Sequence, residues 1–244
     1  MNIDWENLGF KFLPTRSNIR FTYANGAWDD GKLYNDYDIT LSVAANCLHY
    51  GQAIFEGGKA FRCKDGKVRI FRPEENGKRL NSSARHLMMP EFPVEKFVEA
   101  VKTVVRDNVD YIPPYGTGGA LYIRPVMFGT TPQIGVGASL SYTLVIMVVP
   151  VGAYYKDGIK PVDAMISRDY DRAAPHGTGH IKAAGNYAAS LLAGEVAKQV
   201  VEVLCEKHPP LSVRCGAMSK FYAAAKRVLP DRTTQFINKK AYKQ

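Results

Sequence analysis

The sequence predicts a mixed α/β fold rich in hairpins, and three observations carry this prediction. Early in the chain, short stretches that alternate apolar and polar residues meet tight-turn sequences. Two later segments, 73–87 and 94–109, repeat their apolar residues at helical spacing. Two apolar runs, 120–128 and 142–149, then predict longer strands. We therefore expect a small N-terminal α/β domain over residues 1–150.

Two hairpins are expected first. Ile19–Tyr23 alternates apolar and polar side chains and runs into an Asn-Gly pair at residues 25–26, which is a strong signal for a tight turn. Phe61–Cys63 and Val68–Phe71 flank a Lys-Asp-Gly-Lys sequence in the same way. Each pair of stretches therefore predicts two antiparallel strands.

Two helices follow the hairpins. Pro73 suits the first turn of a helix, and the two acidic residues after it favour the positive helix N-terminus. Leu80, Ala84 and Leu87 then recur at helical spacing. The second segment, 94–109, has an apolar stripe of the kind that surface helices turn toward a core; the stripe comprises Phe97, Val101, Val104 and Val105.

The next segments predict the end of one domain and the start of another. Residues 142–149 are almost continuously apolar, which predicts burial on both faces of the strand. Residues 151–158 are expected to link the domains. We expect residues 159–199 to open a larger domain, with a strand at 162–167 and a buried, alanine-rich helix at 183–199.

The end of the chain differs from the rest in pattern and in charge. Residues 201–244 hold nine Lys and Arg against three Asp and Glu, so most of the net charge of +9 lies there. The hydrophobic periodicity also fades after Gln199. We therefore expect residues 200–244 to be an atypical basic tail. The remaining charge is ordinary, and no nucleic-acid surface is predicted on the folded part.

Composition indicates a cytoplasmic protein without a membrane partner. The chain has no run of the roughly 18 to 20 apolar residues that a transmembrane helix needs, and its first residues do not resemble a signal peptide. Its cysteines lack CxxC spacing and are expected to be free thiols; they are Cys47, Cys63, Cys205 and Cys215. The histidines show no metal-ligand pattern, so no metal site is expected.

The residue with the clearest chemical potential is Lys182. It lies in the sequence HGTGHIKAAGNY at residues 176–187, among small and apolar neighbours and just before the expected helix. A lysine that loses hydration there favours its neutral amine, which is the nucleophile of Schiff-base chemistry. A phosphate-binding loop of the Walker type is excluded, because His180 stands where that motif requires lysine.

Four blocks in order resemble the branched-chain amino-acid aminotransferases, which belong to the fold-type IV group of pyridoxal-phosphate enzymes. The blocks are HYGQAIFEGGKAF (49–61), FRPEENGKRLNSSARHLMMP (71–90), LYIRPVMFGTTPQIGV (121–136), and the sequence from PVGAYYKDGIKPV to YDRAAPHGTGHIKAAGNYAASLL (150–192). The resemblance covers residues 5–199. It implies amino-group transfer from Leu, Ile or Val to 2-oxoglutarate, with amino acids and 2-oxo acids as small-molecule substrates and a homodimer or higher homo-oligomer as the assembly.

The same resemblance implies a role for three residues toward pyridoxal 5'-phosphate. Lys182 is expected to hold the cofactor as a Schiff base and then to carry a proton between the substrate α-carbon and the cofactor. Tyr187 is expected to hydrogen-bond the oxygen on the cofactor ring. Arg79, in GKRL, is similar to the phosphate-binding arginine of the family, and its planar fork suits a dianion.

Three further residues match the substrate side of the family's pocket: Tyr50, Tyr122 and Arg124. Aromatic walls suit a branched side chain, and a positive charge suits the substrate carboxylates. Because Tyr122 and Arg124 lie two positions apart on an expected strand, both should point to the same face. Phe12 is expected to add to the wall, on a looser match.

The chain also departs from the family. The resemblance implies a glutamate 30 to 40 residues after the lysine, which pairs with the pyridine nitrogen, but Ser212–Phe221 contains no acid. Gly58 stands where the family usually has a bulkier apolar residue. We therefore hypothesise that the larger domain is incomplete, with residues 200–244 replacing it after a frameshift or in a truncated gene model.

Three alternatives to a working branched-chain enzyme stay open. The first is a catalytically impaired member of the same family, which would persist as a pseudoenzyme. The second is a D-amino-acid aminotransferase or an aminodeoxychorismate lyase, although these relatives usually lack the combination of HYGQAIFEG and FRPEEN. The third is nucleic-acid binding by the basic tail, which would depend steeply on salt.

Overall fold

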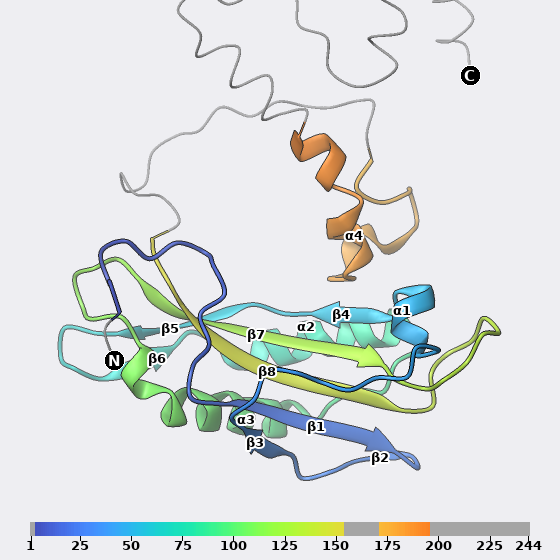
Figure 1. Cartoon of the computed structure of the whole chain (residues 1–244), viewed down its shortest axis with the longest axis horizontal. Helices are drawn as coiled ribbons and strands as arrows, with labels where there is room; N and C mark the ends of the chain where they lie inside the picture. The colour runs from blue at the N-terminus through green and yellow to red at the C-terminus, as the bar shows by residue number, and fades with distance from the viewer. Residues whose placement is uncertain (1–2, 154–170, 196–244) are drawn as a thin grey trace, which may run out of the picture. The chain divides into compact units, whose positions relative to one another are not determined.

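The computed structural model of the chain describes residues 3–153 and 171–195 (Figure 1). Among these, residues 171 and 189–195 belong to a second compact unit, and all the others belong to a first unit. The first unit contains the sheet, its helices and Lys182, so it carries the site.

Several predicted features lie outside the described residues. These are the strand at 162–167, most of the linker at 151–158, the end of the helix expected at 183–199, and the basic tail at 200–244. The predicted domain boundaries therefore stay predictions.

An antiparallel sheet of eight strands is the centre of the first unit (Figure 1). Its main path runs in the order β2 (Ala27–Trp28), β1 (Asn18–Ala24), β8 (Tyr142–Val151), β7 (Ala120–Gly129), β5 (Gly58–Arg62) and β6 (Val68–Ile70). Two short strands pair beside this path: β3 (Lys32–Tyr34) with β1, and β4 (Ala53–Phe55) with β7.

Both predicted hairpins are confirmed. In the turn between β1 and β2, Asn25 and Gly26 have φ angles of 53° and 83°. Positive φ at both central residues is what the favoured two-residue turn requires, and Asn and Gly adopt it most readily. The strands β5 and β6 pair across the second turn, where Gly66 has a φ of 76°.

Two amphipathic helices, α2 (Pro73–His86) and α3 (Val94–Asp107), lie along one face of the sheet (Figure 1). Their apolar stripes and the facing strand residues form the core, which includes Phe21, Leu80, Phe92, Phe97, Val101, Leu121, Leu144 and Ile146. The sequence did not predict the short helix α1 (Asn46–Tyr50) or the 3-10 helices η1 (Val109–Tyr111) and η2 (Thr178–His180).

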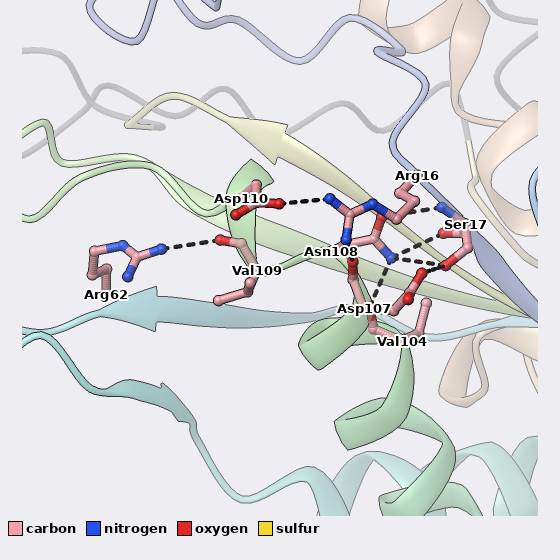
Figure 2. Close-up of polar contacts among 8 residues, drawn as sticks. All are labelled: Arg16, Ser17, Arg62, Val104, Asp107, Asn108, Val109 and Asp110. Atoms are coloured by element: carbon pink, nitrogen blue, oxygen red, sulfur yellow. Dashed lines mark hydrogen bonds and ion pairs between the residues drawn. The ribbon is translucent and has the colours of Figure 1, made fainter. Parts of the chain in front are cut away.

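The helix α3 ends at Asp107, two residues earlier than predicted, and Asn108 joins this end to the segment before β1. Asn108 is fully buried. Its Nδ2 donates to the Val104 carbonyl at 2.7 Å and to the Ser17 carbonyl at 3.1 Å, and its Oδ1 accepts from the Ser17 amide at 3.1 Å (Figure 2). Arg16 donates to the Asp107 carbonyl and pairs with Asp110. The segment before β1 is thereby fixed to the end of α3.

The strands β7 and β8 divide their side chains between two faces. Odd positions of β7 and even positions of β8 enter the core, as Leu121 and Leu144 do. On the opposite face Val145 and Met147 are only half-buried. The prediction that 142–149 is buried on both faces is therefore right for one face and only partly right for the other, because the helices α2 and α3 cover a single face.

The predicted buried helix at 183–199 is wrong in its described part. The helix α4 comprises only Gly185–Ala188, and residues 191–195 form a separate helical stretch. Ala183 cannot begin a helix because it forms a β-bridge with Ile54. The described part of the predicted helix is thus divided into two short helical pieces. None of the described helices is long and apolar enough to cross a membrane.

Candidate active site

The backbone of Lys182 is fixed from two sides. Its carbonyl accepts a hydrogen bond from the Phe55 amide at 3.1 Å, and the Ala184 amide donates to the Ala53 carbonyl at 3.0 Å. The segment 182–184 therefore lies beside β4, with an isolated antiparallel β-bridge between Ile54 and Ala183. The Lys182 amide also donates to Oγ of Ser83 on α2, at 3.2 Å, and Ser83 is buried.

The loop that leads to Lys182 is closed by Asn186, a buried residue of α4. Its Nδ2 donates to the Thr178 carbonyl at 2.6 Å and to the Ile181 carbonyl at 3.0 Å. Its Oδ1 accepts from the Thr178 hydroxyl at 2.6 Å. The side-chain amide of Asn186 thus bonds to both ends of the turn 178–181, and this fixes the backbone conformation just before Lys182.

The Lys182 side chain points to an aromatic pair. Its Nζ donates to the Tyr187 hydroxyl at 3.1 Å and lies 4.5 Å from the centre of the Phe55 ring. The rings of Phe55 and Tyr187 meet edge to face, with centroids 4.7 Å apart. The hydrogen bond and the cation–π contact together aim the amine.

Arg79 on α2 forms a two-point contact with Glu56. Its Nε and Nη2 donate to the two carboxylate oxygens at 2.6 and 2.7 Å. Glu56 is fully buried, whereas the side chain of Arg79 is 56% exposed. The hydrogen bonds that Arg79 donates to Glu56 raise the pKa of Arg79 above its ordinary value.

Tyr122 and Arg124 share one face of β7, as predicted. Nε and Nη2 of Arg124 donate to the Tyr122 hydroxyl at 3.2 and 3.1 Å. The Arg124 guanidinium also lies 4.8 Å from the centre of the Phe55 ring. Phe55 thus contacts the lysine amine as well as the arginine. A cavity of about 160 Å³ opens beside Tyr122 and Arg124, and its other lining residues include Phe10, Phe12, Met147 and Val149.

Tyr50 has its contacts elsewhere. It ends α1, is 41% exposed, and its hydroxyl donates to the Ile134 carbonyl. The contacts described for it do not include Lys182, Tyr122 or Arg124, so its place on the substrate side stays a prediction. The acid-free window at 212–221 lies outside the described residues.

Sequence reasoning missed several residues that build this site: Phe55, Glu56, Ser83 and Asn186. Phe55 and Glu56 stand inside the HYGQAIFEGG block, directly before two glycines. A carboxyl group between an apolar strand and a glycine pair indicates a buried acid, because such an acid has no obvious route to solvent. Ser83 and Asn186 gave no comparable signal, since serine and asparagine are common on helix surfaces.

Known proteins match most of this chain in sequence. No family model matches. A branched-chain-amino-acid aminotransferase of Haemophilus influenzae is 46% identical over 198 residues, which is 81% of this chain and 57% of the relative. The matched part of the chain belongs to the branched-chain-amino-acid aminotransferase family. The predicted family is thereby confirmed, and the D-amino-acid aminotransferase and lyase alternatives gain no comparable support. This chain spans little more than half the length of its family relative.

Solved branched-chain aminotransferases share the fold. The enzyme of Thermoproteus uzoniensis with norvaline superimposes with a TM-score of 0.57 at 26% identity, covering 75% of this chain and 57% of that one. The T.th. enzyme with pyridoxamine 5'-phosphate gives a TM-score of 0.56 at 27% identity, covering 77% and 57%. The predicted mixed α/β fold of the fold-type IV aminotransferases is confirmed over this part.

Proposed function

We propose that this chain transfers amino groups between Leu, Ile or Val and 2-oxoglutarate with pyridoxal 5'-phosphate. The observation that carries the proposal is the Lys182 amine, which lies 3.1 Å from the Tyr187 hydroxyl and 4.5 Å from the centre of the Phe55 ring. An aimed amine, a phenol and a guanidinium are the groups that this cofactor's aldehyde, ring oxygen and phosphate require. The branched-chain aminotransferase relatives support the same reaction.

The residues present fit the cofactor in chemistry. Glu56 occupies Nε and one N–H of Nη2, so the other N–H groups of Arg79 stay available for a phosphate. Tyr187 would hydrogen-bond the ring oxygen, and Lys182 would form the covalent link. When bound, pyridoxal phosphate supplies an electron sink for negative charge at the substrate α-carbon. Once the substrate amino group has taken its place in that link, the freed Lys182 amine would remove the proton at that carbon and return it.

The substrate side of the proposal rests on Tyr122, Arg124 and their surroundings. Arg124 would bind a substrate carboxylate, and the Tyr122 hydroxyl would orient it. Phe55 and the aromatic residues Phe10 and Phe12 would exclude water and contact the branched side chain. The positive charge of Arg124 also suits a carboxylate of 2-oxoglutarate.

Assembly and location complete the proposal. We assign the chain to the cytoplasm and to a homodimer or larger homo-oligomer, as the sequence predicts. The impaired family member remains the competing case, because the window at 212–221 has no acid for the pyridine nitrogen. Glu56 cannot serve that purpose, since both of its carboxylate oxygens bind Arg79.

Two measurements on the full chain test the proposal. Borohydride reduction in the presence of pyridoxal phosphate should label Lys182, and peptide mapping locates the label. Lys182→Arg should lose the label, whereas Lys78→Arg, which changes an exposed lysine paired with Glu75, should keep it. Leucine and 2-oxoglutarate should then yield glutamate. A label elsewhere overturns the proposed site; a label at Lys182 without turnover establishes the impaired member.

A further inference from the structure

We propose that Glu56 is a positioning residue that aims Arg79 at the phosphate group of the cofactor. The inference rests on the proposed function, in which Arg79 binds that phosphate. It assigns a task to a buried carboxylate that the reaction itself does not use.

Several hydrogen bonds fix the position of Glu56, which distinguishes it from the partner of a transient surface ion pair. It is fully buried at the end of β4, and its amide donates to the Pro125 carbonyl at 2.9 Å. Its Oε2 accepts from the Asn76 side chain at 3.0 Å and from the Gly57 amide at 3.1 Å, in addition to the contact from Arg79. A buried carboxylate is tolerated only when its hydrogen bonds are satisfied, and here they are.

The contact with Arg79 fixes the plane of the guanidinium. Two parallel hydrogen bonds from Nε and Nη2 leave the group one orientation, whereas a long side chain that is 56% exposed would otherwise sample many rotamers. The N–H groups of Nη1 and the second N–H of Nη2 then lie on the edge away from Glu56. That edge forms a second fork, already oriented for a phosphate.

Glu56 does not compete with the phosphate for Arg79. Displacing it would leave a buried carboxylate without its main cationic partner, which is strongly unfavourable. Asn76 also binds the Gly57 carbonyl at 3.1 Å, so the turn that carries Glu56 is clamped independently of Arg79. Arg79 can therefore bridge a fixed internal anion and a ligand anion at once.

The test compares two probes, pyridoxal 5'-phosphate and pyridoxal, which differ only in the phosphate. Their dissociation constants are measured by absorbance titration of the full chain. Wild-type protein should prefer the phosphorylated probe, and Glu56→Gln should reduce that preference about tenfold while leaving pyridoxal binding nearly unchanged. Arg79→Gln should give a similar loss, and the double variant should lose little more, because the two residues act as one unit.

Matched variants separate positioning from folding. Glu75→Gln removes an exposed acid of α2, the helix that carries Arg79, and should leave the preference for the phosphorylated probe unchanged. Glu56→Asp keeps the charge and should retain more of the preference than Glu56→Gln; near-UV circular dichroism verifies the fold of each. If Glu56→Gln weakens both probes equally, or if the losses of the double variant add, the inference is wrong. Pyridoxal trapped on Lys182 by borohydride, without any preference for the phosphate, would overturn this inference and leave the proposed function standing. Failure of both probes to reach Lys182 would overturn both.

Discussion

Gly57 has no room for a side chain because the Tyr122 hydroxyl stands where it would go. A Cβ on Gly57 would lie 2.5 Å from that oxygen. The same hydroxyl accepts two hydrogen bonds from Arg124. Because residue 57 has no side chain, the hydroxyl of Tyr122 on β7 can occupy this space.

Gly57→Ala should therefore displace Tyr122. We expect the free energy of unfolding in urea to fall by about 1 kcal/mol, at the low end for overpacking, because the hydroxyl is the far end of its side chain and can shift. Adding Tyr122→Phe should recover part of the loss, since phenylalanine lacks the clashing oxygen. Gly135→Ala is the control, because a Cβ there meets nothing within 4 Å. An unchanged stability in Gly57→Ala would contradict the crowding.

Asn186→Ala should loosen the loop around Lys182. The change leaves the Ile181 carbonyl without this donor and removes one of the two donors to the Thr178 carbonyl, which costs about 1–3 kcal/mol. Hydrogen exchange of the amides in 178–187 should accelerate more than exchange in β7. Asn7→Ala is the matched control, since the amide of Asn7 binds only an exposed carboxylate in the described contacts. Equal acceleration throughout the sheet would show a general loss of stability instead.

Asn108→Ala should destabilise the chain far more than Arg16→Ala, although the two residues join the same segments (Figure 2). Asn108 is fully buried and binds both main-chain groups of Ser17, so its loss should cost about 1–3 kcal/mol. Arg16 and Asp110 are 54% and 59% exposed, and such pairs contribute about 0–1 kcal/mol. Urea denaturation of both variants measures the difference. Equal losses would refute this ranking.

Asp65 should titrate at unusually low pH. Hydrogen bonds from Arg69 hold its pKa at about 2, below the ordinary value of 3.8. Because the folded-state pKa is lowered, the pair stabilises the fold above pH 3.8 and loses this effect as the pH falls through about 2. A carboxyl NMR titration measures the midpoint, and Arg69→Gln should move it toward 3.8. If Arg69→Gln leaves the titration midpoint of Asp65 unchanged, the hydrogen bonds from Arg69 are not the cause of the low pKa.

The parts of the fold that could be predicted are those with local causes. The first hairpin needs only Asn25 and Gly26, and α3 needs only its own apolar stripe. The short strand β4 escaped prediction because three residues are too few for a periodic pattern and its pairing partner is the distant β7. The end of α3 also escaped prediction, because Asn108 forms its hydrogen bonds with Ser17, which lies 91 positions earlier in the chain.

The site divides in the same way. Motifs predict Lys182, Tyr187 and Arg79, and the structure brings the lysine amine to the Tyr187 hydroxyl. Glu56 escaped prediction because the apolar strand and the two glycines that flank it indicate burial but not the partner of its carboxylate. Only the tertiary structure reveals its zero exposure and its pairing with Arg79.

The β-bridge between Ile54 and Ala183 joins two segments that lie far apart along the chain. The amide of Lys182 meets Ser83 across 99 positions of the chain, and the segment 182–184 pairs with β4, which itself pairs with β7. Closing such a long loop carries an entropic cost that local hairpins and helices avoid. We therefore expect the Lys182 amine to reach its place after the local hairpins and helices have formed, so that a nascent chain has no aimed nucleophile until these distant segments meet.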